Sequence, residues 1–141
     1  MIRVQIAGPR CPLGLSRQRV RWAVRAVLQE EGITCAEISV AIVDDPTIRT
    51  LNHRYLGHDE PTDVLAFLLD RRDNRLEGEI VASADTARRV AARYQLSPAD
   101  ELLLYVIHGA LHLAGWRDDT QRRRAAMQSR QHQWLAKLAS R

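Results

Sequence analysis

Residues 101–115 read ELLLYVIHGALHLAG, and this stretch decides the fold because it is apolar on almost every side. A helix that is apolar all round is normally a buried one, so we expect a central buried helix here. Ser97 is suited to the N-cap of this helix and Pro98 to its first turn. Gly115 stands where a left-handed residue would end the helix. The other elements are expected to pack around this segment.

The rest of the sequence predicts an α+β fold, a single small domain with a mixed β-sheet of about four strands packed with helices. Alternating or continuous apolar residues predict strands over 2–7, 38–42, 64–69 and 80–82. A charged turn over 70–75 joins the last two strands as a hairpin. No repeat or linker divides the chain, so one domain over 1–141 is expected.

Helical spacing and cap residues predict four further helices, over 16–32, 45–57, 85–94 and 120–139. Asp45 and Pro46 are expected to open the second of these, with Asp45 as its cap. The last helix is polar and basic, and the apolar residues available to dock it are Ala125, Ala126, Met127, Trp134, Leu135 and Leu138.

Length and composition describe an ordinary globular protein. Of 141 residues, 45% are hydrophobic and 27% charged, which excludes a disordered tail or a fibrous repeat. No apolar run approaches the roughly 20 residues that span a bilayer, and the N-terminus lacks the apolar stretch of a signal peptide. Cys11 and Cys35 are too few for a disulfide framework. We therefore expect a cytoplasmic protein with no membrane partner and no disulfide-linked partner.

The basic surface has two explanations. The formal charge is +4, and of the 21 cationic residues only Lys137 is a lysine. The planar guanidinium of arginine suits phosphate groups, which points to nucleic acid, whereas a codon bias towards arginine would give the same composition without a function. Composition alone favours the bias. The arginines cluster at Arg17, Arg19, Arg21 and Arg25, at Arg71, Arg72 and Arg75, and at Arg117, Arg122, Arg123 and Arg124.

Two histidines within the central apolar helix suggest a metal site. His108 and His112 are four residues apart and share one helix face, close enough to bind one metal ion. Asp118 follows the turn at Gly115 and can add an oxygen ligand. Three protein ligands leave one position open, as in a catalytic zinc site. The alternatives are hydrogen-bonded core histidines and an aspartate that caps the next helix, for which Asp119 is the more natural choice.

The histidine spacing is also that of zinc proteases, but one residue does not fit. Those enzymes carry a glutamate directly after the first histidine as general base, and here that position is Gly109. A small metallopeptidase is therefore a minority interpretation.

Three blocks of the sequence resemble the YbeY family of bacterial RNA-maturation endoribonucleases. His108 to Gly115 is similar to the family's histidine signature, Pro61 to Phe67 to its PTDVLSF segment, and Gly78 to Val81 to the stretch that follows. The resemblance implies a zincin-like metal site on the central helix, one zinc ion and single-strand endoribonuclease activity. It further implies a role in 3′-end maturation of small-subunit (16S) ribosomal RNA and in ribosome quality control. The partners would then be ribosomal RNA and the small ribosomal subunit.

The sequence departs from the family pattern at three positions. Asp118 stands where the family has its third histidine, and a carboxylate ligand also admits other divalent metals. Leu56 follows Tyr55 where the family usually has an arginine, so another arginine would have to contact RNA. Ala66 replaces a serine, which is a minor change.

These considerations give a set of expected site residues. The metal ligands are His108, His112 and Asp118. The candidates for a catalytic role are Asp63 and Arg117, although Asp63 is equally suited to stabilising its own turn. The expected RNA-binding residues are Arg54, Arg117, Arg122, Arg123 and Arg124. An alternative function is a ribosome-binding assembly factor with a structural metal and little nuclease activity, which the missing arginine at Leu56 and the missing base at Gly109 would favour.

Overall fold

The computed structural model describes residues 1–7 and 12–139. Within them four strands form one sheet: β1 (Ile2–Ile6), β2 (Cys35–Val43), β3 (Val64–Arg72) and β4 (Arg75–Ser83). Their order is β1-β2-β4-β3, with β1, β2 and β4 parallel and β3 antiparallel to β4. The predicted α+β class with a mixed four-stranded sheet is therefore confirmed. Cys35 is a free cysteine, and Cys11 lies outside the described residues.

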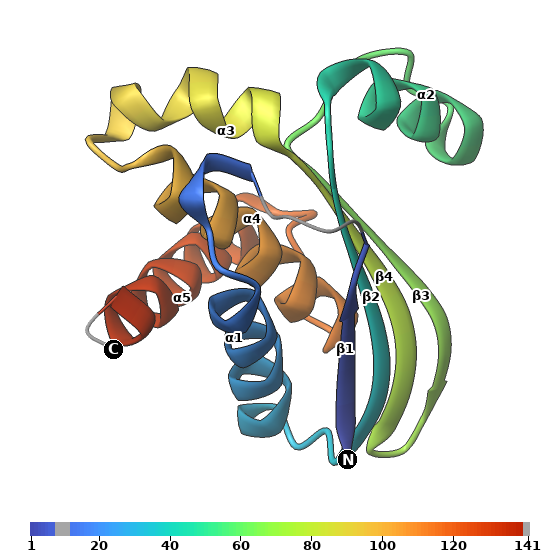
Figure 1. The fold of residues 1–141 in the computed structure, drawn as a ribbon. Helices are drawn as coiled ribbons and strands as arrows, with labels where there is room; N and C mark the ends of the chain where they lie inside the picture. The colour runs from blue at the N-terminus through green and yellow to red at the C-terminus, as the bar shows by residue number, and fades with distance from the viewer. Residues whose placement is uncertain (8–11, 140–141) are drawn as a thin grey trace.

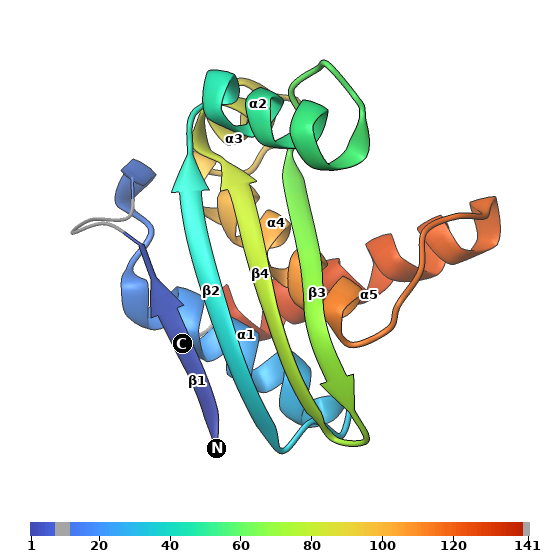
Figure 2. The same cartoon turned by 90° about the vertical axis from the view of Figure 1, so that its right-hand side faces the viewer.

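The long helices lie on one side of the sheet. In Figures 1 and 2, α1 (Arg17–Glu30), α3 (Ala84–Ala91), α4 (Pro98–Leu113) and α5 (Gln121–Ala139) are on the same side, and α2 (Asp45–Leu56) lies at one end of the strands. Short 3₁₀ turns form η1 (Pro12–Gly14) and η2 (Ala92–Tyr94). None of the helices formed by the described residues is both long and apolar enough to cross a membrane.

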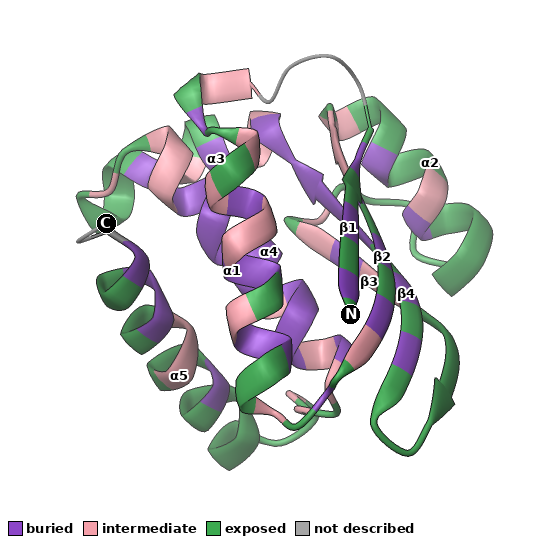
Figure 3. Cartoon of the chain, turned by 60° about the horizontal axis from the view of Figure 1, so that its bottom comes forward, coloured by how far each residue is buried: buried purple, intermediate pink, exposed green. Residues whose placement is uncertain are grey.

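Helix α4 is the central helix that the sequence predicts. It is buried along most of its length (Figure 3), and its N-cap Ser97 accepts a hydrogen bond from the backbone of Asp100. Two glycines bring it close to β4. A Cβ added at Gly109 would lie 2.7 Å from Cγ2 of Ile80, and one added at Gly78 would lie 2.8 Å from Cδ2 of Leu113. The helix therefore rests directly on the sheet.

Helix α1 covers the edge strand β1 through arginine side chains. Guanidinium groups spaced four residues apart donate to backbone oxygens spaced two residues apart: Arg17 to Ile6, Arg21 to Val4 and Arg25 to Ile2, at 3.0, 3.4 and 3.1 Å. The spacing matches because four helical residues rise about 6 Å and two strand residues about 6.6 Å. This arginine cluster therefore satisfies the outer carbonyls of a sheet edge, which would otherwise be open to pairing with another strand.

The start of α2 differs from the prediction by one residue. Asp44, not Asp45, is the N-cap, and it accepts a hydrogen bond from the backbone of Thr47. Asp45 instead accepts hydrogen bonds from Ser83 and Thr86, at the start of α3, and from Arg89, in its last turn. Either aspartate could cap by local chemistry. The contacts with α3 decide between them.

Other boundaries also shift. The hairpin turn is confined to 73–74, because ladder pairing continues through the charged residues 70–72 of β3. The cap of α5 is Thr120, whose Oγ1 accepts from the backbone of Arg123, and not Asp119. Four of the residues expected to dock α5 are buried, whereas Ala125 and Ala126 are exposed: the buried ones are Met127, Trp134, Leu135 and Leu138.

Candidate metal centre

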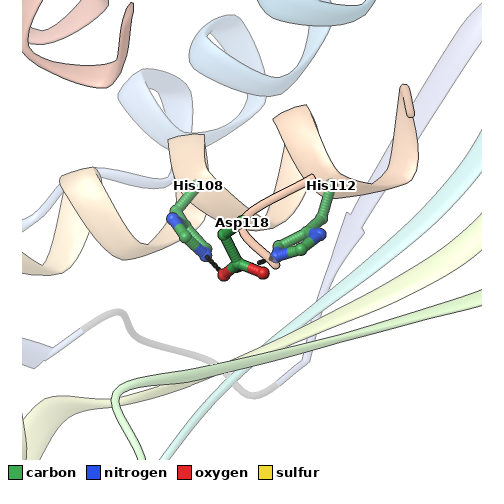
Figure 4. A group of neighbouring side chains, drawn as sticks. All are labelled: His108, His112 and Asp118. Atoms are coloured by element: carbon green, nitrogen blue, oxygen red, sulfur yellow. Dashed lines mark hydrogen bonds and ion pairs between the residues drawn. The ribbon is translucent and has the colours of Figure 1, made fainter. Parts of the chain in front are cut away.

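The site is built on helix α4 and the loop that follows it. His108 and His112 are one helical turn apart, and Asp118 returns to them from the loop that follows the helix (Figure 4). Gly115 makes this return possible with a φ of 111°, a backbone conformation that favours glycine. The amide of Trp116 then donates to the oxygen of Leu111 and closes the helix end. The turn predicted at Gly115 is therefore present.

The three side chains point towards one another. Nε2 of His112 lies 3.2 Å from Oδ2 of Asp118, and Nε2 of His108 lies 3.7 Å from the same oxygen. Ligand atoms of all three residues lie within 4.8 Å of one another. Two donors bound about 2.0–2.1 Å from a tetrahedral zinc ion would be roughly 3.4 Å apart. Two imidazole nitrogens and a carboxylate oxygen at these separations could hold a metal ion.

Gln131, from α5, orients one of the histidines. Its Oε1 lies 2.7 Å from Nδ1 of His108. A hydrogen bond from Nδ1 to this oxygen places the proton on Nδ1 and leaves the Nε2 lone pair directed at Asp118. Metal-binding histidines are commonly held by such a bond from their other nitrogen. The sequence analysis missed Gln131, since nothing in the histidine motif specifies a partner on another helix.

The site lies beside a cavity of about 410 Å³ that His108 and Gln131 help to line. Glu101 lies in its wall, two turns before His108 on the same face of α4, and the sequence analysis missed it as well. Burial raises the pKa of the Glu101 carboxyl, and the charge of Asp63 adds to the effect. The sequence feature that could have identified it is a glutamate that directly precedes the apolar run of α4.

Asp63 lines the same cavity, so the structure brings it close to the histidine group. Its Oδ1 also accepts a hydrogen bond from the backbone of Val64 at 2.7 Å, and its backbone oxygen accepts from Ser83. Asp63 therefore has the turn-stabilising contact that the sequence suggests, together with a position beside the site.

The arginines next to Asp118 carry ion pairs and hydrogen bonds. Arg117 and Arg123 both pair with Asp119, and Nη1 of Arg124 donates to the backbone oxygen of Asp118 at 3.3 Å. The hydrogen bond from Arg123, with the nearby charge of Arg117, holds the pKa of the Asp119 carboxyl below its usual range. One of these arginines therefore contacts the candidate ligand, and the other two pair with the residue next to it.

Three further arginines, Arg54, Arg71 and Arg122, differ in their contacts. Arg122 is exposed on α5 and has no ion pair among the described residues. Arg54 lies exposed on α2, and no contact joins it to the histidine group within the part of the chain that the structure describes. Arg71, at the end of β3, donates to the backbone oxygen of Ala114 at 3.0 Å and so lies at the carboxyl end of α4. The sequence analysis did not place Arg71 at this site.

Two other residues near the site have structural explanations. Gly109 abuts Ile80 on the sheet side of α4, so no side chain at this position could reach the metal group. Trp116 packs against the core, and its Nε1 donates to Glu31, the C-cap of α1. Because Gly109 faces Ile80, this position cannot supply the general base that zinc proteases carry there. The hydrogen bond of Trp116 links the loop after α4 to the end of α1.

Comparisons with known proteins identify the family. The model of a family described as endoribonuclease YbeY matches residues 13–139. A protein of that name from Chloroherpeton thalassium is 40% identical over 124 residues, which are 88% of this chain and 87% of that protein. Another, from Rhodopirellula baltica, is 42% identical over 117 residues, or 82% of this chain and 60% of that protein.

A solved structure agrees with these sequence matches. The solution structure of TM1509 from Thermotoga maritima aligns with a TM-score of 0.66 and 28% identity, over 98% of this chain and 89% of that one. The family model and the relatives cover most of the described chain, and the solved structure shares its fold. The chain belongs to the endoribonuclease YbeY family.

Proposed function

We propose that this chain, as one domain over 1–141, is a metal-dependent endoribonuclease that hydrolyses single-stranded RNA. The observation that carries the proposal is the convergence of His108, His112 and Asp118 at the separations of a metal site, beside a cavity. Family membership supplies the expected reaction, since the relatives are named endoribonucleases. The proposed metal is one zinc ion, and the carboxylate of Asp118 makes the site compatible with other divalent ions.

The chemistry divides between the metal and the protein. A divalent ion held here would polarise a phosphoryl oxygen and lower the pKa of a water ligand towards neutrality. Gln131 keeps the Nε2 lone pair of His108 directed at the site. Compared with a third histidine, Asp118 adds one negative charge next to the ion. Phosphate would therefore be held mainly by cationic side chains around the site.

The arginines beside Asp118 are the proposed phosphate contacts. Arg117, Arg123 and Arg124 border the site, and a phosphate group would compete with Asp119 for the first two of them. Arg122 is exposed on the same helix and adds to this positive surface. A guanidinium group can donate two parallel hydrogen bonds to the oxygens of one phosphate. Arginines are therefore suited to holding an RNA strand while one of its phosphodiester bonds is cleaved. Arg54 is the more remote member of the proposed set.

The proposed substrate is the 3′ region of small-subunit (16S) ribosomal RNA, bound to or destined for the small ribosomal subunit, in the cytoplasm. The resemblance of the sequence blocks supports this substrate, as do the basic residues near the site. A role in ribosome quality control follows from the same resemblance. The metallopeptidase alternative loses its support, because the position of its base is packed against Ile80.

The test is RNA cleavage measured together with metal content. The wild-type protein should hold about one equivalent of metal and cleave a single-stranded RNA that carries the unprocessed 16S 3′ end. Chelation and His112→Ala should each lower the rate by at least about 100-fold, because several kcal/mol of metal stabilisation is lost. His53→Ala, at an exposed histidine on α2, is the matched control and should cleave normally.

The contrary outcomes are distinct. Cleavage that survives both chelation and His112→Ala would refute the metal mechanism. Salt-sensitive binding to ribosomes with no turnover on RNA would favour an assembly factor with a structural metal. Peptide hydrolysis that a chelator abolishes would support the metallopeptidase alternative.

A further inference from the structure

The cavity beside His108 has features that the proposed hydrolysis does not explain. We call it the Glu101 pocket. It occupies about 410 Å³ between α3, α4 and α5, and its wall includes Asp63, Tyr94, Glu101, Tyr105, His108 and Gln131. It thus begins at a candidate metal ligand and extends along α4 away from the metal group. A volume of this order falls in the range of small-molecule sites.

Glu101 is the unusual group in this pocket. The residue is only 5% exposed, and its Oε2 has no hydrogen-bond partner among the described residues. A buried polar atom without a partner is unfavourable, and such atoms are rare in folded proteins. Because the last torsion of a glutamate rotates readily, the carboxyl can present both oxygens to the cavity that it lines. The pocket therefore offers a hydrogen-bonding group that lacks its complement.

The charge of the pocket excludes a phosphate as that complement. Asp63 and Glu101 both line it, and two acidic groups repel an anion. A second metal ion is also disfavoured, since the group of metal-binding side chains found in the described residues is His108, His112 and Asp118. The missing partner should instead be uncharged and bring N–H donors. Tyr94, which is exposed, and Tyr105, which is buried, both line the pocket and supply aromatic surface for a flat ring.

Resting on the proposed function, we infer that the Glu101 pocket binds one nucleobase of the RNA strand next to the cleaved bond, and that Glu101 selects guanine. The phosphates of the strand would follow the arginines beside Asp118, and one base would turn from the metal group into the pocket. Single-stranded RNA is usually recognised in this way, through unstacked bases placed against aromatic side chains.

Guanine is preferred because it fits the carboxyl in either protonation state. An ionised carboxylate accepts from the adjacent N1–H and N2–H of guanine, which no other RNA base offers on its pairing edge. A neutral carboxyl donates to O6 and accepts from N1–H. Adenine and cytosine pair with the neutral form alone, and uracil likewise. Discrimination among the bases therefore comes from the ionised carboxylate, which only guanine can bind through two adjacent N–H donors.

The test measures binding, so that it does not depend on cleavage. Fluorescent RNA pentamers of uridine with G, A, C or inosine at the centre are titrated with the protein in EDTA, with fluorescence anisotropy as readout. We expect the G pentamer to bind roughly 10-fold more tightly than the A pentamer, as one good bidentate pair provides. Inosine keeps N1–H but lacks N2–H, so it cannot give the carboxylate two adjacent donors and should lose most of this preference.

Variants then assign the preference to Glu101. Glu101→Leu should reduce the G-to-A ratio to about 1 while keeping metal content, and removing a buried unpaired carboxyl should not unfold the protein. Glu101→Gln should also lower the G-to-A ratio, because an amide pairs with guanine through O6 and N1–H and with adenine through N1 and N6–H. Glu37→Leu, at an exposed glutamate on β2, is the matched control and should leave the ratio unchanged.

The outcomes separate this inference from the proposed function. Equal binding of the four pentamers by the wild-type protein overturns it, whether or not the protein cleaves RNA, and this measurement needs no variant. A folded Glu101→Leu protein that keeps the G preference also overturns it. A G preference lost in Glu101→Leu supports the pocket even where cleavage proves absent.

Discussion

Oε1 of Gln131 on α5 lies 2.7 Å from Nδ1 of His108 on α4, so a residue 23 positions away sets the orientation of a candidate metal ligand. Met127 and Trp134 anchor α5 to the core on either side of Gln131 in the sequence. The packing of the last helix is thereby coupled to the chemistry of the central one. Damage to this packing should consequently weaken metal binding.

Gln131→Leu tests this coupling. The substitution removes the acceptor for Nδ1 while keeping a side chain of similar size. Loss of such a partner typically lowers metal affinity by about 10–100-fold. Competition with a chelating dye measures the change, and Gln133→Leu, exposed on the same helix, should leave the affinity as in the wild type.

Asp118→Ala and Thr120→Ala separate a ligand from a cap. Thr120 caps α5, so its loss should lower the free energy of unfolding by about 1 kcal/mol and leave metal content intact. Asp118→Ala should do the reverse, with less bound metal and little loss of helix. Metal analysis and urea titration give both quantities. Full metal occupancy in Asp118→Ala would show that Asp118 is not a metal ligand.

Glu101 gives a pH-dependent stability with a definite sign. Burial, and then the charge of Asp63, raise the pKa of this carboxyl above its ordinary value of 4.5. The folded state therefore binds more protons than the unfolded state, and this contribution to stability is lost as the pH rises through the folded pKa. Glu101→Gln cannot ionise, so its stability relative to the wild type should increase as the pH rises above the ordinary glutamate pKa of 4.5. Denaturant titrations at a series of pH values would detect this, and parallel curves for the two proteins would contradict it.

Arg25→Met tests whether the arginines of α1 are structural. Losing the hydrogen bond to the oxygen of Ile2 should lower the free energy of unfolding by about 1 kcal/mol. RNA cleavage should stay at the wild-type rate. Gln29 continues the same row of α1 beyond this contact, so Gln29→Met is the control for surface effects. A drop in RNA affinity in Arg25→Met would instead make this row part of the RNA surface.

Leu56→Arg restores the residue usual in the family. Leu56 is 53% exposed, so an arginine can replace it without disturbing the core. If Leu56 lies along the path of the RNA, one added phosphate contact should steepen the dependence of log K on log salt by about 0.7 for a single strand. Binding titrations at several salt concentrations measure this slope. An unchanged slope would show that RNA does not pass α2 at this point.

Much of the fold could be predicted because its patterns are local. The apolar run of α4 and the caps Ser16 and Ser97 depend on neighbouring residues, and the structure has each of them. The errors arose where two residues were equally suited by local chemistry. Asp44 and Asp45 could both cap α2, and the choice was made by contacts of Asp45 with Ser83 and Arg89, about 40 residues away.

The candidate site divides in the same way. The sequence by itself determined that His108 and His112 face one point, because helical geometry places residues four apart on one side. Only the tertiary structure brought Gln131 to His108, and Glu101 and Asp63 to one cavity, because these contacts depend on how α3, α4, α5 and β3 pack. The same holds for the arginines. The composition gives their number, but only the packed structure shows that Arg25 contacts the edge strand β1 and that Arg124 contacts Asp118. Local geometry follows from the backbone, whereas contacts between distant residues exist only once the core has been packed.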